Sequence, residues 1–124
     1  MPSLRQLLAR HATLLVIDAS SPRVEASLWR DGTVNQAAVD GEASAALPVV
    51  VARVLAEAGG APLRIQDLDA VAFCDGPGSV LGIRLAAASL RVWSVVRPGL
   101  AAYSFHSLPL LAASHPGLTI IADA

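Results

Sequence analysis

Residues 74–84 have the sequence Cys-Asp-Gly-Pro-Gly-Ser-Val-Leu-Gly-Ile-Arg, and they join two apolar segments. The short run Ala70–Phe73 precedes them, and the segment Leu85–Val96, which has neither glycine nor proline, follows them. An apolar run, a glycine-rich turn and a long apolar segment predict a strand, a tight loop and a helix. Ser79 is placed to cap that helix, which we expect to begin near Val80. The unpaired N–H groups of such a helix start suit an anion.

The known phosphate-binding patterns do not match this loop. The Walker pattern needs a lysine after its second glycine, and the dinucleotide pattern needs its third glycine one residue before Gly82. Two interpretations therefore stay open: a loop that binds a nucleotide or phosphate, and a glycine-rich turn that only packs closely. The residues of the first interpretation are Asp18, Ser20, Gly76, Gly78, Ser79, Gly82 and Arg84.

The composition suggests a compact domain that is covered by another molecule. The 124 residues are 54% hydrophobic and only 15% charged, which is more apolar than an ordinary soluble domain. A net charge of −1 predicts no strong binding of nucleic acid by this chain alone. No apolar run has the length of a membrane span, because arginines interrupt the candidates, and we expect no signal sequence. A single cysteine, Cys74, fits a cytoplasmic protein.

The remaining segments predict an α/β fold with a mixed sheet. We predict strands at 13–18, 24–30, 33–39, 70–75, 100–105 and 118–123, and helices at 43–58, 80–96 and 107–114. Asp31-Gly32 is a strong hairpin signal between the second and third strands. Pro48 fits the first turn of the helix at 43–58, and Gly59-Gly60 ends that helix. The order is βββαβαβα followed by one more strand.

The two ends of the chain need separate interpretations. Residues 1–12 carry leucines at helical spacing, and we expect an N-terminal extension that is either a short helix or a tail. The last strand ends in Asp123-Ala124, as the first ends in Asp18-Ala19. We therefore assign residues 13–115 to one lobe and residues 116–124 to the first strand of a truncated second lobe.

Four segments in the same order resemble the TsaB (YeaZ) family of bacterial proteins, which acts in the N6-threonylcarbamoyladenosine modification of tRNA. These segments are Val16–Ser20, Leu28–Gly32, Asp67–Val71 and Gly76–Arg84, with a weaker match at Ile121–Ala124. The motif Gly-Pro-Gly-Ser-x-x-Gly-x-Arg is the specific one, and the others support it. The resemblance covers roughly residues 13–124, but only the first half of the family's length.

The resemblance implies an RNase H-like lobe of the actin-like ATPase (ASKHA) fold, which actin and sugar kinases share. It also implies a scaffold without catalytic activity of its own, in spite of the older family name glycoprotease. Such a scaffold pairs with the catalytic subunit TsaD through two helices of the first lobe, with TsaE and ATP supporting the cycle. It further implies a homodimer in isolation, and ATP or ADP only as ligands of the assembled complex.

The chain departs from the family at Val80-Leu81, where Phe-Thr is usual, and at Ala19, where Thr is usual. The metal site of TsaD needs a His-x-x-x-His pair, and the three histidines, at 11, 106 and 115, do not have that spacing. We therefore predict no metal. The alternative function is a phosphotransferase lobe of the same superfamily that binds ATP. A metallopeptidase would need ligands that the sequence lacks.

Individual residues keep two interpretations each. Asp18 ends the first strand, where an Asp of the phosphotransferases in this superfamily holds Mg²⁺ and phosphate. The alternative is that its carboxylate caps the turn at Ser20–Ser21. Arg84 neutralises a phosphate or a partner's acidic group, or it pairs with Asp75 within the lobe. Cys74 follows a buried strand without a neighbouring base, so we expect an inert core thiol.

The two long helices carry the interface prediction. The second is apolar nearly all round, so we expect it to be buried on two sides, with the sheet on one and a partner on the other. The small residues Ala88 and Ser89 would allow close helix packing. The alternative is that the first helix alone covers the second side. The predicted interface residues are Leu47, Val50, Val51, Val54, Leu55, Leu85, Ala88, Ser89, Val92 and Trp93.

Overall fold

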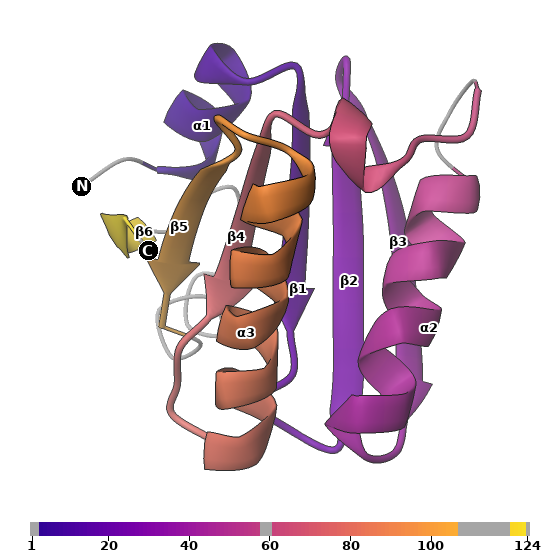
Figure 1. The fold of residues 1–124 in the computed structure, drawn as a ribbon, viewed down its shortest axis with the longest axis vertical. Coiled ribbons are helices and arrows are strands. Elements are labelled where there is room, and N and C mark those ends of the chain that lie inside the picture. The colour runs from indigo at the N-terminus through magenta and orange to yellow at the C-terminus, as the bar shows by residue number, and fades with distance from the viewer. Residues whose placement is uncertain (1–2, 58–60, 107–119, 124) are drawn as a thin grey trace.

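The computed structural model describes residues 3–57, 61–106 and 120–123, which form a mixed α/β fold around one sheet (Figure 1). The strands are β1 (Thr13–Asp18), β2 (Arg23–Arg30), β3 (Thr33–Asp40), β4 (Ala70–Cys74), β5 (Ala101–Phe105) and β6 (Ile120–Asp123). The helices are α1 (Leu4–Arg10), α2 (Ala43–Ala56), the 3₁₀ turn η1 (Ile65–Asp67) and α3 (Val80–Val96). The predicted helix at 107–114 and the predicted stop at Gly59-Gly60 lie outside the described residues.

The sheet has the strand order β3-β2-β1-β4-β5-β6. β2 pairs antiparallel with both β1 and β3, whereas β4 is parallel to β1 and to β5. The hairpin turn is built by Asp31 and Gly32, whose φ angles of 49° and 81° are both positive. This is the turn geometry that Asp-Gly favours, because it matches the twist of the flanking strands. The predicted hairpin and mixed sheet are therefore confirmed.

β6 lies at the edge of this sheet and pairs antiparallel with β5. The sequence assigned this strand to the start of a second lobe. In the described structure Ala122 lies opposite Ser104 of β5. The second lobe itself stays a prediction.

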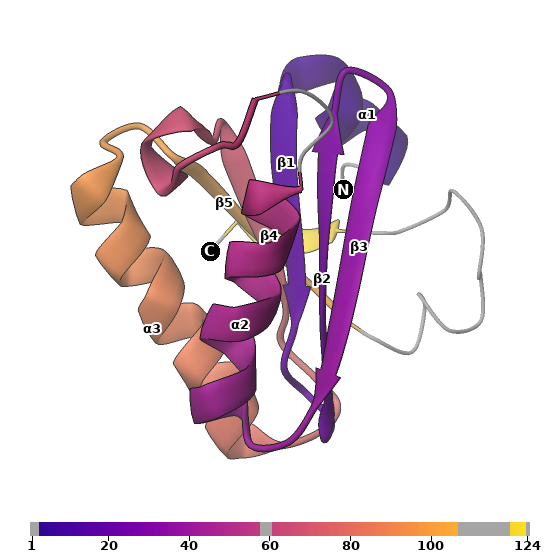
Figure 2. The ribbon, with the colours of Figure 1, turned by 90° about the vertical axis from the view of Figure 1, so that its right-hand side faces the viewer.

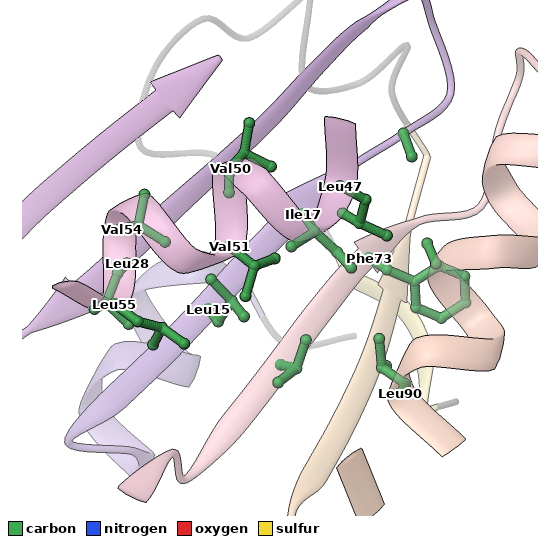
Figure 3. Close-up of a cluster of buried hydrophobic side chains, with 14 of the residues drawn as sticks. Leu15, Ile17, Leu28, Leu47, Val50, Val51, Val54, Leu55, Phe73 and Leu90 are labelled. Carbon is green, nitrogen blue, oxygen red and sulfur yellow. The ribbon is translucent and has the colours of Figure 1, made fainter. Parts of the chain in front are cut away.

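The main core lies between one face of the sheet and the helices α2 and α3, which cover that face together (Figure 2). β1 and β2 contribute Leu15, Ile17 and Leu28 to this core, and α2 contributes Val50 and Val54 (Figure 3). All five side chains are buried to 1% exposure or less. Alternation along the strands explains the choice of face, since every second residue points toward the helices.

The opposite face of the sheet packs against α1 (Figure 2). Ser3 and Gln6 form a reciprocal capping box at the start of α1. Leu7 is fully buried among Leu14 and Phe105 of the sheet. Of the two interpretations of the N-terminal extension, the helix is therefore the one that the structure has, and it is packed against the sheet rather than loosely held.

The predicted position of Pro48 in the first turn of α2 is wrong. α2 begins at Ala43, because the carbonyl of Glu42 accepts the first helical hydrogen bonds from Ala45 and Ala46. Pro48 lies more than one turn beyond that start, inside the helix.

Among the described helices, none combines the length and the apolar character needed to cross a bilayer.

Candidate functional site

The glycine-rich loop after β4 packs against the turn that follows β1. The N–H of Ser79 donates to the carbonyl of Ser20 at 2.7 Å. A Cβ atom added at Gly78 would lie 2.2 Å from that same carbonyl oxygen. At Gly82 an added Cβ would lie 1.8 Å from the carbonyl oxygen of Ala19. Real Cβ atoms do not approach this closely, so these glycines are needed for contact with the chain's own backbone.

The polar groups of this corner also bind one another. The Asp18 carboxylate accepts hydrogen bonds from the backbone N–H of Ser20 at 2.9 Å and from its hydroxyl at 2.5 Å. Ser79 caps α3 as predicted, since its hydroxyl oxygen accepts from the N–H of Gly82 at 3.2 Å. The interpretation of Asp18 as a turn cap is therefore confirmed. Phosphate binding by this corner stays a prediction.

Asp75 pairs with His106 rather than with Arg84. The His106 Nδ1 atom lies 2.6 Å from the Asp75 carboxylate, and the N–H of Asp75 donates to the carbonyl of Phe105 at 2.9 Å. Arg84 is exposed and makes no ion pair within the described part of the chain. The alternative in which Arg84 pairs with Asp75 is therefore wrong.

The register of β4 and β5 explains the Asp75–His106 pair, which the sequence did not predict. Cys74 lies opposite Phe105 in the parallel pair of β4 and β5. The residues that follow such partners come to the same carboxyl edge of the sheet, so Asp75 and His106 meet there. Cys74 itself is fully buried, as expected for a core thiol, and its sulfur lies 3.7 Å from the carbonyl of Gly76. His11 lies elsewhere, with its Nε2 atom 2.9 Å from the Tyr103 hydroxyl.

The predicted interface residues divide into three sets. Val50 and Val54 belong to the core and have no exposed surface for a partner, so their assignment to the interface is wrong. A groove of about 340 Å³ runs between α2 and α3. Six of the predicted residues line this groove: Leu47, Val51, Leu55, Leu85, Ser89 and Trp93. The remaining two residues lie on α3, where Ala88 is half-buried and Val92 is exposed.

The side of α3 that faces away from the sheet carries apolar side chains that are uncovered within the described structure. Three large apolar residues of this side are Leu81, Val92 and Val95, whose exposed fractions are 76%, 62% and 80%. Ala88 lies between them at helical spacing. The buried residues on the other side of α3 are Gly82, Ala86 and Leu90. We call the four residues Leu81, Ala88, Val92 and Val95 the α3 outer face.

Sequence reasoning found Ala88 and Val92 of the α3 outer face but missed Leu81 and Val95. The missed residues lie seven positions before and after Ala88, which places them on the same side of a helix. That spacing was a usable signal. The expectation of a second apolar side on this helix is correct, and α2 covers only the flank that borders the groove.

The solved structures that are similar to this chain in fold include two with YeaZ in their names. YeaZ from Pseudomonas aeruginosa superposes with a TM-score of 0.67 at 21% identity, over 91% of this chain and 66% of its own chain. An uncharacterized protein with similarity to peptidase YeaZ from Pseudomonas aeruginosa superposes with a TM-score of 0.65 at 28% identity, over 82% of this chain and 47% of its own. No protein-family model and no curated protein matches the chain.

The chain thus spans about two thirds of the length of one of these structures and about half of the other. The resemblance to the TsaB (YeaZ) family is confirmed at the level of the fold. The mixed α/β architecture expected from the sequence is the one that the YeaZ structures share.

Proposed function

We propose that this chain, which has the fold of the YeaZ structures, is a non-catalytic scaffold that supports N6-threonylcarbamoyladenosine modification of tRNA. It acts by docking a TsaD-type catalytic subunit on the layer formed by α2 and α3. The observation that carries the proposal is the α3 outer face, where Leu81, Val92 and Val95 are mostly exposed. Large apolar side chains gathered on one helix face of a soluble domain mark a protein contact.

The energetics of this surface favour a helical partner. Burying an exposed Val or Leu side chain contributes about 1.5–3 kcal/mol, so the α3 outer face could supply several kcal/mol. Ala88 in its middle is small, which allows the backbone of a second helix to approach. The neighbouring groove, lined by Leu85 and Trp93, extends the apolar surface toward α2.

The glycine-rich corner supports a scaffold rather than an enzyme. The carboxylate of Asp18 is bound to Ser20, and the hydroxyl of Ser79 is bound to the N–H of Gly82. These hydrogen bonds give Asp18 and Ser79 structural roles, as the caps of a turn and of a helix. In the proposal, any ATP or ADP is a ligand of the assembled complex with the catalytic subunit and a TsaE-type ATPase.

The substitution Val92→Asp tests the docking surface. It places a carboxylate on the α3 outer face, where docking would desolvate it. We expect the Kd for a purified TsaD-type catalytic subunit to rise by at least about 30-fold, which corresponds to ~2 kcal/mol. Because Val92 is exposed in the free chain, the circular dichroism spectrum and the melting temperature should stay those of the wild type. Isothermal titration calorimetry measures the Kd.

Val34→Asp is the matched control. Val34 is an exposed valine of β3, and it lies opposite Trp29 on the face of the sheet away from α2 and α3. Its substitution adds the same charge without touching the proposed surface. Wild-type affinity of Val92→Asp, or an equal loss in both variants, would contradict the proposal.

A further inference from the structure

The exposed side of α3 carries charge as well as apolar surface. Arg84 and Arg91 are both exposed, and they lie seven residues apart, so they share one side of the helix. Each lies four residues, about one helical turn, before a residue of the α3 outer face: Arg84 before Ala88, and Arg91 before Val95. Neither arginine forms an ion pair with any residue in the described ranges.

The two helices have no acidic residue to balance these charges. The sequence of α2 contains Arg53 as its sole ionisable side chain, and that of α3 contains Arg84 and Arg91. The helical residues of α2 and α3 therefore combine apolar surface with positive charge only, although the whole chain has a net charge of −1. The acidic residues nearest in sequence are Glu42 and Glu57, which flank the ends of α2, and Asp75, which precedes α3 and pairs with His106.

We infer that this surface is built for an acidic partner and against a second copy of the chain. The partner presents an apolar helix face flanked by carboxylates, which pair with Arg84 and Arg91. This inference rests on the proposed function and specifies the chemistry of the docked subunit. Arginine suits the role, because its planar guanidinium binds a carboxylate through two parallel hydrogen bonds.

Self-pairing of the same surface is electrostatically unfavourable. A two-fold dimer brings the same patch of both copies together. Burying Ala88 and Val95 against their copies would also bring Arg84 and Arg91 of both copies into the interface. Neither α2 nor α3 has a carboxylate that could pair with them. Like charges placed together in an interface disfavour that partner. The homodimer implied by the family resemblance is thus the weaker of the two assemblies.

A protein surface explains the patch better than a nucleic acid does. Phosphate backbones are bound by dense basic patches, and their affinity comes from many charge contacts. Here the two arginines accompany three large apolar side chains that are mostly exposed, Leu81, Val92 and Val95. Such a mixture is typical of a helix that docks on another protein.

The first test measures self-association of the isolated chain by sedimentation equilibrium. For the wild type, we expect self-association to strengthen between 50 and 500 mM NaCl, because salt screens the repulsion between arginines. The substitution Arg84→Glu should strengthen it at least tenfold at 50 mM NaCl, because a carboxylate then meets Arg91 of the other copy. Tight self-association of the wild type at low salt, weakened by Arg84→Glu, would overturn the inference.

The second test measures binding to a purified TsaD-type catalytic subunit. The double variant R84E/R91E should raise the Kd at least tenfold, and the wild-type Kd should rise with salt, as expected for pairing of opposite charges. Arg5→Glu is the control, because Arg5 is exposed on α1 at the other face of the sheet. This variant should bind as the wild type does.

The outcomes separate this inference from the proposed function. Loss of binding by Val92→Asp together with wild-type binding by R84E/R91E would overturn the acidic partner and leave the docking surface intact. Wild-type binding by both variants would overturn both. Binding of the wild type to unmodified tRNA alone, lost in R84E/R91E, would assign the arginines to nucleic acid and overturn the inference as well.

Discussion

Glycines and their neighbours show how single residues form the corner between β1 and α3. The motif at residues 76–84 predicted a tight turn and a helix cap, and the cap at Ser79 is confirmed. The pattern could not show what the glycines approach, because a missing side chain indicates only that space is needed. The structure gives the answer at Gly78 and Gly82, which contact the carbonyls of Ser20 and Ala19.

Gly82→Ala tests this contact. In an ordinary helix, alanine in place of glycine stabilises by about 1 kcal/mol. Here the added methyl group would meet the Ala19 carbonyl oxygen at 1.8 Å, inside a packed corner. We therefore expect the free energy of unfolding to fall by about 2 kcal/mol, because overpacking outweighs helix propensity. Urea denaturation followed by circular dichroism measures the change.

Gly41→Ala serves as the reference for that experiment. An added Cβ at Gly41 meets nothing within 4 Å, although its φ of 144° disfavours any side chain. The loss should therefore be smaller than at Gly82. If Gly82→Ala instead raised stability, the close packing of the glycine-rich loop would be refuted.

At the scale of elements, the sequence predicted most boundaries but not which side of each helix is free. α2 has a distinct apolar side, and its Val50 and Val54 are core residues. α3 is apolar nearly all round, so periodicity alone does not select its buried side. Packing makes the selection, because Ala86 and Leu90 face the sheet while Val92 remains exposed.

Pro48→Ala tests the interior position of Pro48 in α2. Proline there lacks an N–H for the carbonyl of Ser44, and its ring crowds that carbonyl. The substitution restores the hydrogen bond, so we expect the free energy of unfolding to rise by about 1 kcal/mol or more. Thermal unfolding measures the gain.

The comparison for Pro48→Ala is Pro22→Ala, in the turn before β2. The carbonyl of Pro22 accepts a hydrogen bond from the N–H of Gly41. The fixed φ angle of this proline lowers the conformational entropy of the unfolded chain, which stabilises the folded state. This variant should show no gain. Destabilisation by Pro48→Ala would mean that packing of the ring in the groove between α2 and α3 outweighs the missing hydrogen bond.

For the whole molecule, local patterns predicted the element order and the mixed sheet, and the YeaZ structures share this architecture. Contacts between distant segments were harder to predict. The Asp75–His106 pair depends on the parallel register of β4 and β5, which no single segment encodes. The last strand, β6, pairs with β5 at the sheet edge, and its assignment to the start of another lobe stays a prediction.

The layered arrangement is consistent with the docking role proposed for this chain. The sheet buries one side of α2 and α3 and holds both helices in a fixed relation (Figure 2). Their other side, with the groove and the α3 outer face, is thereby presented as a preformed surface. A preformed surface loses little conformational entropy on binding, which favours affinity.

Hydroxyl-radical footprinting of the chain with and without a TsaD-type catalytic subunit tests the docking surface most directly. Oxidation of an exposed side chain reports its contact with solvent. We expect oxidation of Leu81, Val92 and Val95 to fall at least threefold in the complex, because docking covers the α3 outer face, while Val34 on the other face of the sheet reacts as before. Unchanged oxidation of the α3 outer face under conditions where the complex forms would contradict the account.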